Sequence, residues 1–251
     1  MQKVTDQIKE QFENNAKSVR GLLKFDELIL EVSIAQLREV NNKLKNIHEI
    51  DNPLLLVDNA IKALENIKKH ESLKAQYETM YNQCLVLLVS YFTSAVTDLF
   101  IKAVQYSADN GIELKCSKED FKFSFKELTD YKFDLKGIVG ELIVTKNQIS
   151  FQDMQSSCRA FKKYLSVEIE QNTDINNIIL SQACRHAIVH ASSVVNEKCI
   201  KQIRDANPRD LKEKLEDGDE ITFSVEEIGK VIGSMTNFIN MVSNKLNKNL
   251  T

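Results

Sequence analysis

The sequence predicts an all-α protein, and three observations lead to that prediction. Its 251 residues include only two prolines and seven glycines, so few residues interrupt helices. Leu, Lys and Glu, which favour helices, are among the common residues. Apolar residues recur with helical spacing in the N-terminal part. We expect a helical domain over residues 71–251, preceded by a separate helical segment of unknown role over residues 1–70.

The segment 1–70 contains two or three predicted amphipathic helices. One apolar stripe, interrupted by Asn41, indicates a helical hairpin that packs on the rest of the chain, and a coiled-coil seam is the less favoured alternative. Asn52 is a candidate N-cap with Pro53 in the first turn of the next helix. The stripe consists of Leu30, Ile34, Leu37, Leu44 and Ile47.

The longest apolar run, residues 84–100, lies in an expected helix over residues 71–107. It is short for a membrane span and contains Ser90, Thr93 and Asp98 among other polar residues. We therefore expect a buried core helix and no membrane segment.

Charge and cysteine content also restrict the class of protein. The formal net charge is −3, which gives no global attraction to nucleic acid or to anionic membranes. The N-terminus mixes charges of both signs and does not resemble a signal peptide. Five widely spaced cysteines without a CxxC pair indicate reduced thiols and a cytoplasmic location.

The least helical part of the sequence is the segment 112–149. "FKFSF" at 121–125 alternates like a strand, so a short strand or an irregular insertion is expected here. Its three phenylalanines could stack on nucleobases, but core packing is the favoured interpretation.

The C-terminal part contains two predicted capping boxes. Ser150 with Asp153 and Ser224 with Glu227 each place an acidic residue three positions after a serine at a helix start. The helices expected here cover residues 150–165, 174–192 and 224–245.

"CRHAIVHASS" at residues 184–193 concentrates ionisable side chains on an otherwise apolar helix. His186 and His190 share a helix face and could bind a metal. However, the glutamate of an HExxH motif is missing, and His48 and His70 are the only other histidines. No metal or cofactor is therefore expected.

Two further interpretations remain for these residues. In a structural interpretation, Arg185 forms an ion pair with a neighbouring helix and the histidines are satisfied, partly buried side chains. In a catalytic interpretation, a histidine transfers protons near neutral pH and Arg185 binds phosphate oxygens with its planar guanidinium.

The stretch from Arg185 to His190 has the pattern of an arginine, a polar residue, three further residues and a histidine, and it lies on the penultimate long helix of an all-α domain. This pattern resembles the motif of the HEPN superfamily. The closest likeness is to the RiboL-PSP-HEPN and related microbial defence branches, over residues 75–248. "LVLLVSYFTSAVTDLF" is similar to the first core helix of the family. "ISFQDMQSSCRAFKKYL" is similar to the helix before the motif, and "SVEEIGKVIGSMTNFINMVSNKL" to the closing helix.

The resemblance implies a metal-independent endoribonuclease that cleaves RNA through attack by its own 2′-hydroxyl. His190 would transfer a proton, Arg185 would stabilise the transition state, and His186 would orient its neighbours or contact phosphate. Arg185 and His190 point about 140° apart on a helix. A single chain therefore presents only half of the catalytic site. The resemblance implies a homodimer in which the two motif helices face each other and complete the site.

The resemblance also implies a role as a toxin or an anti-phage effector, with an antitoxin or a regulatory protein as a possible partner. Ser192 stands where a subset of the family has a modified tyrosine, and Ala191 stands where many members have asparagine. Relatives often carry an acidic residue on the first core helix, for which Asp98 is a candidate and Thr93 a polar substitute. Weaker candidates for RNA contacts, which could equally form a solvated face, are Lys198, Lys201 and Arg204.

Two hypotheses from other classes stay open. One is a HEPN-fold module that retains the motif without using it and binds a nucleotide or a protein. The other is a helical scaffold in which Arg185 forms a structural ion pair.

Overall fold

The computed structural model confirms the all-α class. It describes residues 1–45, 51–69, 74–114, 120, 122–135 and 137–250, and within these ranges no strand forms. One isolated antiparallel bridge joins Val194 to Glu220. The helices are α1 (Gln2–Lys45), α2 (Asp51–Lys69), α3 (Lys74–Asp109), α4 (Phe125–Asp130), α5 (Val139–Lys146), α6 (Met154–Leu165), α7 (Thr173–His190), α8 (Glu197–Ile203) and α9 (Val225–Asn249).

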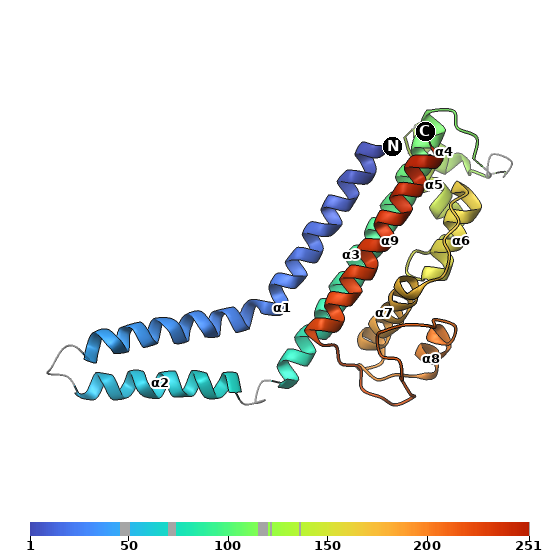
Figure 1. Ribbon diagram of the computed structural model, residues 1–251. Coiled ribbons are helices and arrows are strands. Elements are labelled where there is room, and N and C mark those ends of the chain that lie inside the picture. The colour runs from blue at the N-terminus through green and yellow to red at the C-terminus, as the bar shows by residue number, and fades with distance from the viewer. Residues whose placement is uncertain (46–50, 70–73, 115–119, 121, 136, 251) are drawn as a thin grey trace.

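Helices α3, α7 and α9 form the centre of the bundle, and the first part of α1 lies along α3 and α9 (Figure 1). The ring of Phe92 on α3 contacts Phe12 of α1 and Phe238 of α9, with centroids 6.2 and 5.5 Å apart. Each pair is close to edge-to-face, the arrangement that aromatic quadrupoles favour. The N-terminal residues thus share one core with the bundle.

Helix α3 carries the apolar run and has the predicted core role. By length and composition alone, its stretch Ala75–Asp109 could cross a membrane. In the bundle, however, Leu85, Leu88, Leu99 and Phe100 have no exposed surface. Burial against other helices therefore accounts for the apolar composition of this helix.

Helix α1 changes direction part-way, and its second part pairs with α2 in an arm that projects from the bundle (Figure 1). We define the arm as residues 24–45 and 51–69. The Asn41 amide donates to Asp58 over 2.6 Å, and Arg38 pairs with Glu65. These contacts form the predicted hairpin, but its predicted packing on the rest of the chain is wrong for the arm, because among the described residues α2 contacts α1 and no other helix of the bundle to a comparable extent. Ile47 lies outside the described residues.

The expected strand at residues 121–125 is wrong in the described part of that segment. Ser124 caps α4 through a capping box with Glu127, so helix begins where alternation predicted extension. The side chain of Phe125 is 77% exposed, which also contradicts core packing for this residue. The alternative prediction, an irregular insertion, is confirmed for the described residues of the segment, which form loops and two short helices. Phe121 lies outside the described residues.

The starts and ends of the later helices match the predictions to within four residues. The N-cap of α6 is Asp153, which accepts from the backbone of Gln155 and Ser156, so the predicted capping box at Ser150 is wrong. The capping box of Ser224 and Glu227 is confirmed at the start of α9. Helix α7 ends at His190, two residues earlier than expected.

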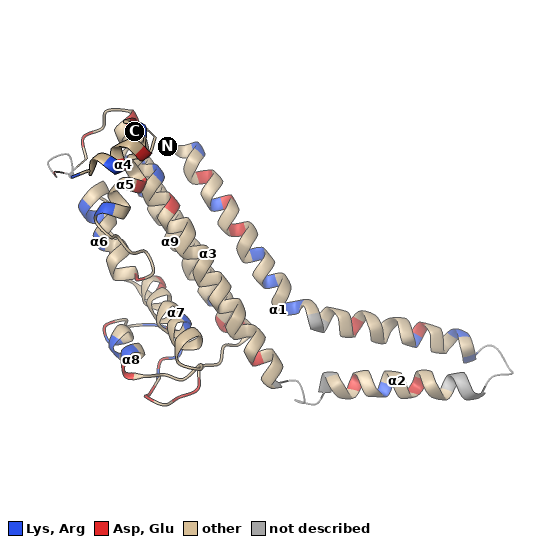
Figure 2. Cartoon of the chain, turned by 180° about the vertical axis from the view of Figure 1, so that it is seen from behind, with Lys and Arg blue, Asp and Glu red and all other residues tan. Residues whose placement is uncertain are grey.

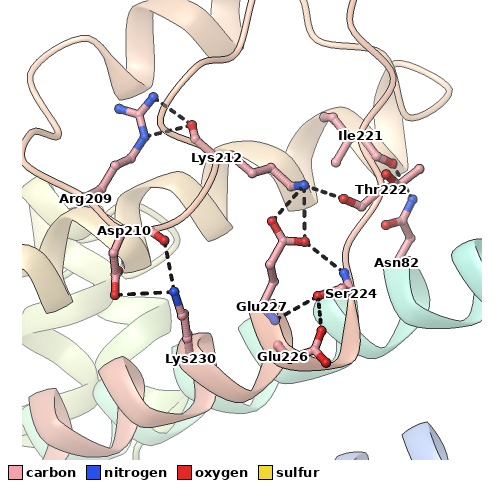
Figure 3. Close-up of polar contacts among 10 residues, drawn as sticks. All are labelled: Asn82, Arg209, Asp210, Lys212, Ile221, Thr222, Ser224, Glu226, Glu227 and Lys230. Atoms are coloured by element: carbon pink, nitrogen blue, oxygen red, sulfur yellow. Dashed lines mark hydrogen bonds and ion pairs between the residues drawn. The ribbon is translucent and has the colours of Figure 1, made fainter.

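The segment between α8 and α9 is held by polar contacts (Figure 3). The Lys212 ammonium pairs with Glu227 over 3.1 Å, and Lys230 lies 3.8 Å from Asp210. The Arg209 guanidinium donates to the carbonyl of Lys212. Since their charged groups make internal contacts, Arg209 and Lys212 serve this segment structurally.

Candidate functional site

Polar side chains fix the rotation of α7 at its N-terminal half. All residues from Ile175 to Cys184 are buried. The Asn176 amide donates to the carbonyl of Pro208 over 2.8 Å, and the Asn177 amide donates to Asp210 over 2.6 Å. Because buried amides need partners, these bonds determine which face of α7 is turned towards the segment after α8.

The C-terminal half of α7 borders a pocket of about 770 Å³ between α3, α6, α7 and α8. That volume lies in the range of small-molecule sites. Most lining side chains are polar or charged. The lining residues are Val89, Ser90, Thr93, Ser150, Gln152, Asp153, Gln155, Ile179, Gln182, Ala183, Arg185, His186, Lys198, Lys201, Gln202 and Asp205.

Arg185 lies in this pocket without a protein counter-ion. The residue is half-buried, and in the described part of the chain no side chain or carbonyl forms a hydrogen bond or an ion pair with it. A partly desolvated guanidinium without an acceptor favours binding of an anion. The structural interpretation, an ion pair to a neighbouring helix, has no support among the described residues.

His186 lies beside Arg185 and contacts Lys198 across the pocket. The Lys198 Nζ is 3.0 Å from Nε2 of His186. Since an ammonium group only donates, Nε2 accepts and the ring is neutral. Burial lowers the pKa of His186 below its ordinary value, and the charges of Lys198, His190 and Arg185 lower it further. Both the contact with Lys198 and the lowered pKa favour the unprotonated imidazole in this pocket.

His190 is placed differently from the other two motif residues. It is exposed at the last position of α7 and does not line the pocket. Its ring nevertheless lies against the ring of His186, with centroids 4.7 Å apart and planes tilted by 49°. The motif thus contributes two side chains to the pocket and a third beside it.

The structure separates the two auxiliary candidates on α3. Thr93 lines the motif pocket, whereas Asp98 lines a cavity of about 330 Å³ against α1. Five residues along a helix turn the side chain by about 140°, which places them on different faces. Burial raises the pKa of the Asp98 carboxyl, and Lys102 opposes that rise.

The basic residues after the motif are also divided. Lys198 and Lys201 line the pocket, and Lys201 pairs with Glu197 over 3.3 Å. Arg204 is exposed at the end of α8 and outside the pocket lining. Ser192 is exposed with a φ of 52° and also lies outside it. Figure 2 shows charges of both signs around α8.

Sequence reasoning missed Gln182, which stands three positions before Arg185 and lines the same pocket. The residue is 8% exposed. The backbone N–H of Met154 donates to its Oε1 over 2.9 Å, while its Nε2 has no partner among the described residues. The i, i+3 spacing from Arg185 was the available signal.

In the described part of the chain, no group of three or more His, Cys, Asp or Glu side chains could hold a metal ion. His48 and His70 lie outside the described residues.

Comparison of the chain with protein families, with curated proteins and with solved structures finds no match.

Proposed function

We propose that this chain is a HEPN-type endoribonuclease that cleaves RNA without a metal or cofactor, through attack of the 2′-hydroxyl on the neighbouring phosphorus. One observation carries the proposal: Arg185 has no protein counter-ion in the described part of the chain, and it lies beside neutral His186 in an open pocket. A guanidinium stabilises charge that develops on phosphate oxygens, and a neutral imidazole can accept the hydroxyl proton. Neither the charge stabilisation nor the proton transfer requires a bound metal.

The reaction needs two proton transfers on opposite sides of phosphorus. A base removes the 2′-hydroxyl proton as that oxygen bonds to phosphorus, and an acid protonates the 5′-oxygen as its bond breaks. His186 and His190 lie side by side, so they reach the same side of one phosphate. We therefore propose that a second copy of the chain supplies the opposing histidine.

The surface around the end of α7 suits such a homodimer. Val189 is 46% and Val194 is 38% exposed, on either side of His190 and Ser192. Apolar side chains exposed next to a candidate site are typical of a surface that another chain covers. Pairing of the C-terminal ends of α7 from two copies would bring His190 of each copy to the edge of the pocket in the other copy.

Substitution of the motif tests the nuclease. Arg185→Ala and His190→Ala should each reduce cleavage of a mixed cellular RNA substrate by a factor on the order of 10² or more. Arg20→Ala, on the exposed surface of α1 and outside every candidate for RNA contact, is the control and should cleave normally. Circular dichroism and light scattering report whether folding and dimer formation are unchanged. Full activity in both motif variants would refute the proposal.

A binding module for a nucleotide is the second candidate, because His190 lies outside the pocket lining. It predicts an affinity for nucleotides that depends on Arg185, without RNA products from the wild-type chain. The resemblance to microbial defence proteins further supports a cytoplasmic toxin or anti-phage role with a regulatory protein partner. Growth arrest on expression, abolished by Arg185→Ala, would support that role.

A further inference from the structure

A second cavity, of about 330 Å³, lies between the first part of α1 and α3. The two helices run side by side along the bundle (Figure 1). The lining residues of this cavity follow the spacing i, i+3, i+4 and i+7 from Ile8 to Asn15 on α1, and again from Tyr91 to Asp98 on α3. One face of each helix therefore turns towards the cavity, which we call the α1–α3 groove.

The lining of the α1–α3 groove combines apolar and polar side chains. Its buried apolar residues are Ile8, Phe12 and Ala95. Its half-buried polar residues are Asn15, Tyr91 and Asp98. In the described part of the chain, no hydrogen bond or ion pair joins these three polar side chains to another residue. Their polar atoms are therefore available to a ligand or to water.

Asp98 is the only charged residue among the described residues of this lining. Both oxygens of its carboxyl group keep accessible surface, so a ligand can reach them. The charge of Lys102, one turn further along α3, acts on Asp98, but the two residues form no ion pair. Burial raises the pKa of the Asp98 carboxyl, so the folded chain disfavours the charged form while no cation is bound. A bound cation would relieve that cost.

A protonated primary amine matches these groups. It neutralises one carboxylate, and its three N–H bonds need three acceptors. The carboxylate of Asp98, the amide oxygen of Asn15 and the hydroxyl of Tyr91 can accept them. A divalent metal is a poorer match, because it needs several oxygen ligands and a single carboxylate compensates only one of its two charges. The volume of about 330 Å³ takes a molecule of on the order of ten non-hydrogen atoms.

We propose that the α1–α3 groove binds a small organic cation, with its one ammonium group on Asp98 and its apolar body on the buried apolar residues of the lining. This site is separate from the motif pocket, because Thr93 and Asp98 lie on different faces of α3. It goes beyond the proposed ribonuclease and does not depend on it. Its ligand is an amine and not a nucleotide, whose phosphate the Asp98 carboxylate would repel.

The matched probes are 2-phenylethylammonium and 2-phenylethanol, which share an apolar body and differ only in the ammonium and hydroxyl groups. Titration of the full-length chain, followed by NMR of the Ile8 and Ala95 methyl groups, should show the amine binding about tenfold more tightly. Asp98→Asn keeps the size of the side chain and removes its charge, so the two probes should bind this variant equally. Glu10→Gln removes the same charge from an exposed position of α1 outside the lining, and it should keep the preference.

The comparison of the two probes on the unmodified chain does not depend on the folding of any variant. Equal affinity of that chain for the two probes, or no binding of the amine at millimolar concentration, would overturn the inference. A preference that survives in Asp98→Asn, or that Glu10→Gln also loses, would overturn it as well. RNA cleavage plays no part in these measurements, so the ribonuclease proposal can fail while this site stands.

Discussion

At the residue scale, the contact between Lys198 and His186 determines which form of the imidazole the pocket presents. The ammonium donates to Nε2, so the remaining ring proton lies on Nδ1. Binding of a phosphate would compete for the same ammonium group. Release of Lys198 would then leave Nε2 able to accept a proton from the substrate.

Lys198→Met should raise the pKa of His186 towards its ordinary value. Burial is the largest cause of the lowered pKa and persists in the variant, but the nearest positive charge is removed. Titration of the His186 ring by NMR measures the change. Lys201→Met, whose ammonium pairs with Glu197, is the control and should leave the midpoint in place. An unchanged midpoint in Lys198→Met would show that the contact does not persist in solution.

The same lowered pKa gives the sign of a pH effect on stability. Below the ordinary pKa of histidine, about 6.5, the unfolded chain binds a proton at His186 more readily than the folded chain. This contribution to stability is therefore present above that pH and is lost as the pH falls through the lower, folded pKa. In His186→Asn, the fall in the urea midpoint between pH 7.5 and pH 5 should be smaller than in the wild type.

At the element scale, the close approach of α5 to α3 requires a glycine. A Cβ atom at Gly140 would overlap the carbonyl of Ile101, whereas a Cβ at Gly229 in α9 would meet no atom within 4 Å. A side chain at the first position must push the two helices apart. A side chain at the second only reduces the freedom of the unfolded backbone.

Gly140→Ala should therefore lower the free energy of unfolding by about 1–3 kcal/mol. Gly229→Ala, the matched control, should raise it by about 0.5–1 kcal/mol. Denaturation in urea with both variants measures the two changes. Equal effects of the same sign would mean that the two helices do not approach closely.

Individual elements also show where sequence reasoning succeeds. Helix α9 was predictable because Ser224 and Glu227 form a local motif that needs no tertiary context. The alternation around Phe125 failed because three alternating residues are too few to outweigh a helix cap at Ser124. Asp153 and Ser150 can both cap a helix, and only the approach of the chain to α7 selects Asp153.

The candidate site was only partly predictable, for a reason that lies in α3. This helix is apolar on most of its circumference, so its sequence does not show which face α1 covers. The choice between Thr93 and Asp98 depends on that rotation and became visible only in the fold. Arg185 and His186 could be named in advance because ionisable groups are rare on a buried helix.

At the scale of the whole molecule, the bundle and the arm differ in how they are stabilised. The bundle has a continuous apolar core that includes the first part of α1. The arm has few buried side chains, among them Ile34, Asn41 and Ile61. Its stability therefore depends more on single polar contacts than that of the bundle.

Asp58→Ala should loosen the arm and leave the bundle intact. It removes the acceptor of the buried Asn41 amide, at a cost of about 1–3 kcal/mol. Hydrogen exchange followed by mass spectrometry should show faster exchange in the arm and unchanged protection in α3, α7 and α9. Glu39→Ala, which breaks an exposed pair with Lys43, is the control and should change little.

If the pocket binds a ligand as proposed, we expect the amides that anchor α7 to influence its recognition from a distance. Asn177 and Arg185 are eight residues apart, about 12 Å along the axis, yet they belong to one rigid helix. A small turn of that helix at Asn177 would swing the guanidinium across the mouth of the pocket. Screens for loss of function should therefore recover substitutions such as Asn177→Ala. We expect these variants to fold, although the substituted residue does not contact the ligand.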